Sequence, residues 1–370
     1  MLFKKFFFNL KYFDWQLLIV SIILISFGLA ALYSVALGRA EQNLLNFKKQ
    51  LVFFAAGFVL LLFFSLFDYR FFKVYSLHFY IVSVLSLLFV LFFGKTLRGT
   101  RGWFSFFGLN IQPVEIAKIA LIVILSNFLS HYAPKKETFG FVFLSGLIAG
   151  ILFLLVILQP DLGSAVIIFL IWFLMMLACG IKKKYVLAIL ILISLISAGS
   201  WFLLFKDYQK ERIMTFLDPS RDPYGRGYQV KQAVTAVGAG GFLGRGLGFG
   251  SQSQLKFLPA AQTDFIFAVI AEELGLFGIF LLLLFFGIFF YRISKISKNA
   301  SSDFGIFLAL GAGILFFVQF FINIGMNLGI MPVTGISLPF LSYGGSFLIS
   351  SLVLVGILES IAVRNIKYRA

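Results

Sequence analysis

The sequence predicts an all-α integral membrane protein, a polytopic bundle of about ten transmembrane helices. Hydrophobic residues make up 61% of its 370 residues and charged residues only 12%, and its mean hydropathy is +1.01. A soluble domain is usually about half apolar and about a quarter charged. Runs of roughly 20 apolar residues, the length a helix needs to span the hydrocarbon core, recur along the chain. A soluble fold could not bury so many continuous apolar stretches.

Ten stretches are expected as membrane helices, at 15–36, 51–67, 74–93, 114–131, 141–158, 163–181, 185–205, 264–291, 304–327 and 338–361. The first exceeds the apolar core of a signal peptide, which is about 7–15 residues long, so we interpret it as a retained helix. The sequence shows no convincing internal repeat. We therefore expect a single transmembrane domain over residues 1–370, which includes a long connection at 206–263.

Lys and Arg residues are distributed unevenly between the two sides of this bundle. With the N-terminus inside, the inner segments carry sixteen of them, namely Lys4, Lys5, Lys11, Arg70, Lys73, Lys135, Lys136, Lys182, Lys183, Lys184, Arg292, Lys295, Lys298, Arg364, Lys367 and Arg369. The short outer connections carry six, namely Arg39, Lys48, Lys49, Lys95, Arg98 and Arg101. This bias predicts cytoplasmic N- and C-termini. The net charge of +16 is then a topology signal that also attracts anionic membrane lipid, and it does not indicate nucleic-acid binding.

The connection 206–263 is far longer than any other, and this topology places it outside. It holds eight basic and four acidic residues, and long loops without obvious secondary structure are often functional. The excess of positive charge favours an anionic ligand, and a merely solvated positive loop is the open alternative. Its glycine-rich part at 238–250 follows no predicted strand, so it does not indicate a dinucleotide site.

Charged residues near the outer ends of the helices are the most informative feature. An ionisable residue within a membrane span costs about 2.5–3.5 kcal/mol and marks function by default. Glu115 and Lys118 have the i, i+3 spacing of an ion pair. Asp161 lies in a short outer turn, and Asp264 is expected to open the eighth span. Each has a structural alternative: an ion pair that fixes packing, a turn or cap residue, and a helix-terminal carboxylate favoured by the dipole.

A second set of polar residues is predicted within the bundle. Glu272 and Glu273 lie roughly 12 Å deeper than the start of the eighth span, at 1.5 Å per residue. Gln319, Asn323 and Asn327 fall at i, i+4 and i+8 on the ninth span and should form a polar stripe facing the interior. Contact between helices is the structural alternative for this stripe.

Segments along nearly the whole chain together resemble the SEDS family of bacterial cell-wall proteins, of the RodA and FtsW type. The matching segments are Trp103-Phe104, Gln112-Pro113-Val114-Glu115-Ile116-Ala117-Lys118, Gln159-Pro160-Asp161-Leu162-Gly163, Glu211-Arg212-Ile213, Asp218-Pro219, Gly227-Tyr228-Gln229, Leu258-Pro259, Thr263-Asp264-Phe265-Ile266-Phe267-Ala268, Glu272-Glu273-Leu274-Gly275 and Pro332 to Ser346. The short tails and the Pro332-Val333-Thr334-Gly335 segment resemble RodA more than FtsW. The chain departs from the family pattern at Gly102, Ala233, Ala239 and Gln262.

The resemblance implies a peptidoglycan glycosyltransferase that polymerises lipid II on the outer face of the bacterial cytoplasmic membrane during cell elongation. Asp264 would be the general base that takes the proton from the acceptor sugar 4-hydroxyl during an inverting attack. The substrate-binding residues are expected to be Arg212, Trp103, Asp161, Gln229, Thr263 and Ser342.

The resemblance also implies a partner, a class B penicillin-binding protein with transpeptidase activity. No metal site is predicted, and Mg or Mn as a divalent cofactor remains open. Two other functions also remain open: a lipid II flippase and a non-catalytic scaffold of the elongation machinery. Transporters place coupling charges near the midplane on broken helices, and Glu272 is the residue that favours the flippase.

Overall fold

Membrane-spanning helices account for most of the chain. The computed structural model describes residues 12–37, 44–97, 99–106, 109–132, 136, 138–203, 207–255 and 257–365. Among these residues, nine helices are long and apolar enough to cross a membrane. They are α2 (Trp15–Leu37), α3 (Leu45–Leu66), α5 (Ser76–Phe93), α6 (Pro113–Tyr132), α7 (Phe139–Leu158), α8 (Leu162–Cys179), α13 (Ile266–Asn299), α14 (Asp303–Asn327) and α15 (Gly345–Val363).

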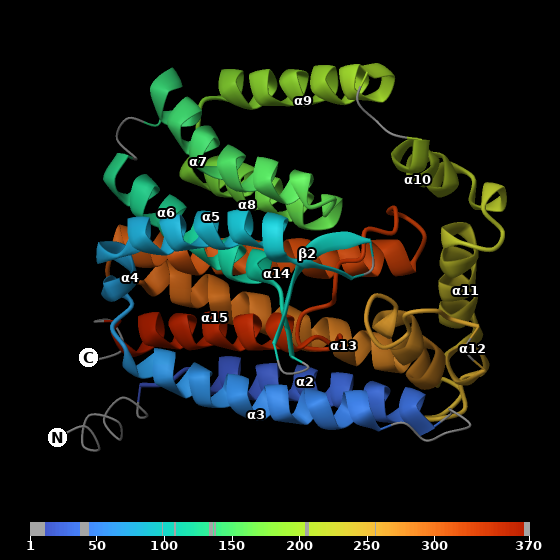
Figure 1. Cartoon of the computed structure of the whole chain (residues 1–370). Helices are drawn as coiled ribbons and strands as arrows, with labels where there is room; N and C mark the ends of the chain where they lie inside the picture. The colour runs from blue at the N-terminus through green and yellow to red at the C-terminus, as the bar shows by residue number, and fades with distance from the viewer. Residues whose placement is uncertain are drawn as a thin grey trace.

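A further helix of 21 residues, α9 (Lys183–Leu203), corresponds to the seventh predicted span. The start of α2 and the end of α15 lie together, because the backbone N–H of Asp14 donates to a Glu359 carboxylate oxygen at 2.9 Å. A chain that begins and ends on one side crosses an even number of times, so α9 provides the tenth crossing. Figure 1 shows α9 at the edge of the bundle. The predicted all-α polytopic fold is confirmed.

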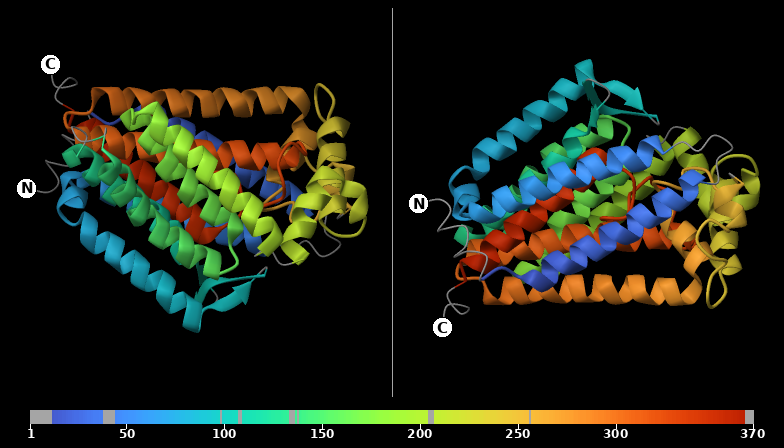
Figure 2. Two further views of the ribbon diagram at one scale, coloured as in Figure 1. Left: turned by 90° about the horizontal axis from the view of Figure 1, so that it is seen from above. Right: turned by 90° about the horizontal axis from the view of Figure 1, so that it is seen from below.

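The centre of the bundle is formed by α6, α14 and α15. α15 packs against α3 and α6, and α14 packs against α13, α6 and α8. Figure 2 shows α5 and α13 along opposite edges. Close backbone approach, rather than exclusion of water, drives helix association in lipid. Gly356 of α15 shows this, because a Cβ added there would lie 2.5 Å from the carbonyl oxygen of Leu61 in α3.

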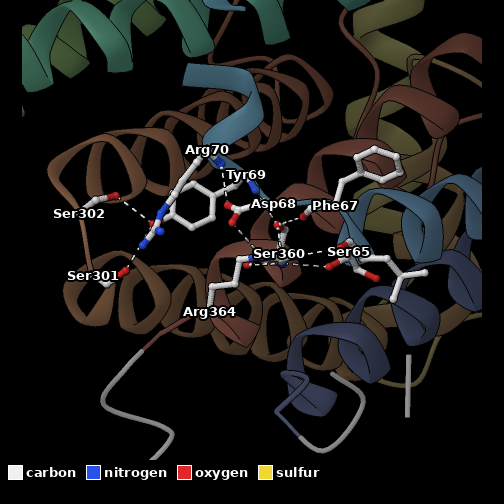
Figure 3. Close-up of polar contacts among 10 residues, drawn as sticks. Ser65, Phe67, Asp68, Tyr69, Arg70, Ser301, Ser302, Ser360 and Arg364 are labelled. Carbon is white, nitrogen blue, oxygen red and sulfur yellow. Dashed lines mark hydrogen bonds and ion pairs between the residues drawn. The ribbon is translucent and has the colours of Figure 1, made fainter. Parts of the chain in front are cut away.

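The end of α3 is held by α15 through hydrogen bonds to carbonyl groups that a helix end leaves unpaired. Arg364 donates from Nη2 to the Leu66 carbonyl at 2.6 Å and from Nη1 to the Ser65 carbonyl at 3.3 Å. The Ser360 hydroxyl donates to the Phe67 carbonyl. Figure 3 shows these side chains converging on the turn that leads to the short helix α4 (Arg70–Val74).

Three predicted helix boundaries differ from the structure by six residues or more. α3 begins at Leu45 rather than at 51, and α13 continues to Asn299, eight residues beyond the predicted end at 291. α15 begins at Gly345 rather than at 338. The stretch before it contains Pro339 and forms a turn in which Phe340 has a φ of +68°, so an apolar run there is not helical.

The connection 206–263 is more ordered than the sequence suggested. It contains α10 (Asp207–Leu217), the 3₁₀ turn η2 (Pro219–Arg221), α11 (Arg226–Ala239) and α12 (Ser251–Gln254). Hydrogen bonds from Ser220 cap this turn and hold the pKa of Asp218 below its ordinary value. In Figure 1 these elements lie across the end of the bundle opposite the start of α2 and the end of α15, and we call this end the loop end.

A small sheet at the loop end was not predicted. β1 (Lys95–Leu97), β2 (Thr100–Phe106) and β3 (Leu109–Ile111) pair antiparallel in the order β1-β2-β3. Lys95 pairs with Trp103, and Phe104 pairs with Ile111. The two outer strands have only three residues each, too short for an alternating pattern to reveal them. The sheet places Trp103 beside the cavity described below.

Candidate active site

A cavity of about 680 Å³ opens at the loop end of the bundle. Its walls come from α3, the sheet, α6, α8, α11, α14 and the two segments that precede α13 and α15. The ionisable side chains that line it are Lys49, Glu115, Lys118, Asp161, Arg226 and Asp264. The predicted charged residues at the outer helix ends therefore share one site, which two further cations also enter.

Asp264 lies in a turn rather than in a helix. The sequence placed it at the start of the eighth span, whereas α13 begins two residues later at Ile266. The turn is closed by the N–H of Thr263, which donates to the Ala260 carbonyl at 2.9 Å, and Ala260 has a φ of +52°. Asp264 is half-buried and lines the cavity. Asp264 thus lies one residue before the N-cap of α13, so its carboxylate is at the positive end of the helix dipole as well as in the cavity wall.

The polar stripe on α14 holds the backbone of Asp264. Asn323 and Asn327 each donate an amide N–H to the Asp264 carbonyl at 3.0 Å. Asn323 also donates to the Ile336 carbonyl at 2.8 Å, and Asn327 accepts from the Ala268 N–H at 3.1 Å. Both asparagines are fully buried. We call this arrangement the asparagine clamp, because it fixes the backbone on both sides of the start of α13.

Glu115 and Lys118 form the predicted ion pair on α6. Lys118 Nζ lies 2.7 Å from Glu115 Oε1, and the lysine side chain is only 2% exposed. Removing one partner of a buried pair costs about 3–5 kcal/mol, because the other charge is left uncompensated. The pair lines the cavity, so it supplies a rigid wall with no net charge beside the space that a ligand would occupy.

Asp161 caps α8. Its Oδ1 accepts from the Ser164 N–H at 3.0 Å, and its Oδ2 accepts from the Ser164 hydroxyl at 2.8 Å and the Gln112 amide at 3.3 Å. The cap interpretation is thus present in the structure, although Asp161 also lines the cavity. The three donors that bind its carboxylate fix Asp161 at the start of α8 and stabilise its charged form.

Three of the predicted ligand-binding residues line the cavity. Trp103, Asp161 and Gln229 line the cavity together with Asp264. The Trp103 indole N–H and the Thr334 hydroxyl, both in its walls, have no hydrogen-bond partner among the described residues. These polar groups are suited to bind an uncharged part of a ligand.

Two other predicted ligand-binding residues, Thr263 and Ser342, also make structural contacts. Both are buried and neither lines the cavity of about 680 Å³, although Thr263 lines a neighbouring cavity of about 350 Å³. The Ser342 hydroxyl donates to the Thr263 carbonyl at 2.6 Å and accepts from the Leu338 N–H at 2.8 Å. These bonds join the turn before α13 to the turn before α15, across 79 residues of sequence. A part in substrate binding stays a prediction for both residues.

The cations of the cavity were only partly identified from the sequence. Arg212 lies in α10, but its side chain is outside the described part of the chain. Arg226 at the start of α11 and Lys49 in α3 line the cavity, as does Lys118. Lys49 and Arg226 had been counted only as general positive charge of the outer connections, and nothing in their local sequence indicated which of those charges enter the site.

Glu272 does not belong to the polar group formed by Gln319 and the asparagine clamp. Gln319 is buried and lines the cavity, whereas the Glu272 carboxylate accepts from the backbone N–H groups of Gln252 at 2.8 Å and Ser253 at 3.1 Å. Glu273 accepts from the Gln254 amide at 3.2 Å. Both glutamates thus bind the connection that precedes α13.

Comparisons with known proteins identify the family. The chain matches the FtsW/RodA/SpoVE family, described as cell cycle protein, over residues 14–367. The peptidoglycan glycosyltransferase MrdB of Escherichia coli strain K12 is 34% identical over 361 residues, which cover 97% of this chain and 95% of the relative.

Solved structures show the same relationship. A chain from a peptidoglycan synthase complex that coordinates polymerization and crosslinking has a TM-score of 0.81 at 28% identity, covering 96% of this chain and 99% of that chain. The rod shape determining protein RodA of Thermus thermophilus has a TM-score of 0.71 at 25% identity, covering 96% and 98%. This chain therefore belongs to the FtsW/RodA/SpoVE family of cell cycle proteins, the SEDS family that its sequence motifs indicate.

Proposed function

We propose that this protein is a peptidoglycan glycosyltransferase that polymerises lipid II, with Asp264 as its general base. The observation that carries the proposal is the position of Asp264, whose side chain lines the cavity and whose backbone is held by the asparagine clamp. Three cations, Lys49, Lys118 and Arg226, line the same cavity. The family relationship and the name of the MrdB relative support the assignment.

The proposed reaction is the one that the family resemblance implies, and the charges in this cavity are consistent with it. Asp264 takes the proton of the acceptor sugar 4-hydroxyl, and the oxygen attacks the anomeric carbon of the donor. The new C1–O4 bond forms as the bond from C1 to the pyrophosphate oxygen breaks, and undecaprenyl pyrophosphate leaves with the electron pair. An α-linked donor then gives a β-1,4 product by one inverting displacement. Cations beside the leaving group stabilise its developing negative charge.

Other residues of the cavity are proposed to bind the pyrophosphate and the sugars of the substrate. Arg226 and Lys49 are placed to attract the pyrophosphate, and Arg212 remains a predicted contributor. Trp103, Gln229 and Asp161 are placed to contact the sugars. Among the described residues, no group of three His, Cys, Asp or Glu side chains converges as a metal site. A divalent cation, if the reaction uses one, would therefore be held mainly by the pyrophosphate and not by a protein ligand set.

A flippase is less well supported than a polymerase. Glu272 favoured transport in the sequence, but its carboxylate binds the backbone of Gln252 and Ser253. It is thus committed to a fixed connection rather than to a pathway through the membrane. A scaffold needs neither a carboxylate nor buried cations in a cavity. A class B penicillin-binding protein is the partner we propose, in keeping with the peptidoglycan synthase complex that contains the structural relative.

Asp264→Asn should abolish most polymerisation of lipid II by the purified protein. The amide has the same shape but cannot accept the hydroxyl proton, and general base catalysis contributes about 10²- to 10⁴-fold. Glycan product should be measured by gel electrophoresis, with thermal unfolding as the check on folding.

The matched control is Asp161→Asn, a second carboxylate in the cavity whose amide oxygen can still cap α8. It should lose much less activity than Asp264→Asn. The base assignment fails if folded Asp264→Asn polymerises lipid II at nearly the parental rate. Parental protein that translocates lipid II but forms no glycan would instead support the flippase.

Arg226→Ala should lower kcat/KM for lipid II by roughly 10- to 100-fold, the equivalent of a lost charged hydrogen bond worth about 1.5–3 kcal/mol. Arg226→Lys should restore only part of the loss, because an ammonium group lacks the planar bidentate fork. Arg221→Ala is the control, since Arg221 lies in the same connection but is exposed and paired with Asp218. Equal activity of the two alanine variants would remove Arg226 from the site.

We also propose that the protein lies in the bacterial cytoplasmic membrane with both termini in the cytoplasm. In a Cys179→Ala background, Tyr224→Cys should react with an impermeant thiol reagent added outside spheroplasts. Lys183→Cys and Lys298→Cys, at the other end of the bundle, should react only after lysis. All three positions are exposed, so accessibility within the fold does not confuse the result. The opposite labelling pattern would invert the topology and place the cavity in the cytoplasm.

A further inference from the structure

Helix α13 is interrupted near the loop end at Gly275, whose φ of 63° and ψ of −160° are not helical. Backbone groups freed by such a break are costly in lipid unless the protein satisfies them. The Leu276 N–H donates to the Gly241 carbonyl at 2.9 Å, and the Phe277 N–H donates to the Phe242 carbonyl at 3.1 Å. The connection between α11 and α12 therefore replaces the hydrogen bonds that α13 lacks.

The other side of the break is satisfied by the same connection. The Glu272 carbonyl accepts from the Arg245 N–H at 3.0 Å, and the Glu273 carbonyl accepts from the Gly246 N–H at 2.9 Å. Glycine permits this close approach, because a Cβ added at Gly244 would lie 2.1 Å from the Glu273 carbonyl oxygen. The height of this connection along α13 is thus fixed by backbone contacts.

Large apolar side chains on this fixed connection point away from the protein. The exposed fractions are 81% for Phe242, 83% for Leu243 and 76% for Phe249. Phe242 is hydrogen-bonded through its backbone to Phe277, which is itself 59% exposed on α13. The apolar surface of the connection is therefore continuous with the outward face of a membrane-spanning helix.

The position along α13 indicates what covers this surface. The apolar run Leu274–Tyr291 is about 27 Å long at 1.5 Å per residue, close to the roughly 30 Å of a hydrocarbon core. Glu273 precedes the run, and Arg292, which is paired with Asp14, follows it. The contact at Phe277 thus lies in the first turn of the run, where the hydrocarbon meets the lipid headgroups and where aromatic side chains are favoured.

We propose that residues 240–250, here called the anchor loop, insert Phe242, Leu243 and Phe249 into the membrane leaflet at the loop end. The occupant of this surface is lipid, because the surface continues the lipid-facing side of α13 at the depth of the headgroup boundary. The anchor loop joins α11, which carries Arg226 and Gln229, to the segment that leads to Asp264. Insertion therefore holds one wall of the cavity at a fixed height above the bilayer.

Spin labels can measure this insertion directly. Phe242→Cys and Phe249→Cys, each in a Cys179→Ala background, would carry a nitroxide in protein reconstituted alone into phosphatidylcholine–phosphatidylglycerol nanodiscs. Phe280→Cys, 60% exposed on α13, is the lipid-facing control, and Tyr224→Cys, 96% exposed before α11, is the water-facing control. Collision with oxygen, which concentrates in lipid, is compared with collision with a water-soluble nickel chelate.

The oxygen-to-nickel collision ratios at 242 and 249 should be well above the ratio at 224 and approach that at 280, which lies deeper in the bilayer. Ratios at both positions equal to the ratio at 224 would overturn the proposal. Labels that are water-accessible in the protein alone and become protected only after a transpeptidase partner is added would also overturn it, because the surface would then be a protein contact. Each position reports separately, so one perturbed variant does not decide the result.

Discussion

Two buried amides on α14 hold the site together. Asn323 and Asn327 both donate to the Asp264 carbonyl, and they also bind Ile336 and Ala268. A single polar stripe thereby joins the turn before α13, the first turn of α13 and the segment before α15. Buried amides are stable in a membrane protein only when their hydrogen bonds are made. The cost of burying them is offset here by contacts that also fix where the Asp264 side chain enters the cavity.

The charged residues of the bundle do three different things. Glu115 and Lys118 form a wall of the cavity, and Glu272 holds the connection that precedes α13. At the opposite end, fully buried Glu359 accepts from the Asp14 N–H and links the first and last helices. Charged residues in membrane spans therefore mark the candidate active site and also the contacts that hold helices and connections together. The position of a charged residue in the sequence does not tell which of these roles it has.

Much of this arrangement could be predicted from sequence. Hydropathy and length predict the helices, and the motif around Asp264 predicts a carboxylate at the site, because both signals are local. Its role as the base is our proposal. The asparagine stripe on α14 was predicted from its spacing, although its target, a backbone carbonyl, was not. Thr263 and Ser342 were assigned to the substrate because the motif includes them. That assignment stays a prediction, and the structure adds a contact between them that local sequence does not indicate, from the Ser342 hydroxyl to the Thr263 carbonyl.

Local sequence also does not show which basic residues enter the cavity. A basic connection predicts an anionic ligand, but entry of Arg226 into the cavity depends on where α11 begins, after Gly225 and the Asp222 side chain that caps it. Breaks within a helix also depend on distant contacts. The break at Gly275 in α13 is tolerated because the anchor loop supplies the missing hydrogen bonds. Periodicity along one segment cannot report either feature.

The most direct measurement is the kcat of lipid II polymerisation, separated from KM, for Asn327→Ala. Asn327 lies behind the cavity and binds the backbone of Asp264, so it acts as a positioning residue. Its removal should lower kcat by about 10²-fold, the usual effect of a misplacement of about 1 Å, with little change in KM. A folded Asn327→Ala protein with the parental kcat would contradict the view that the asparagine clamp positions the general base.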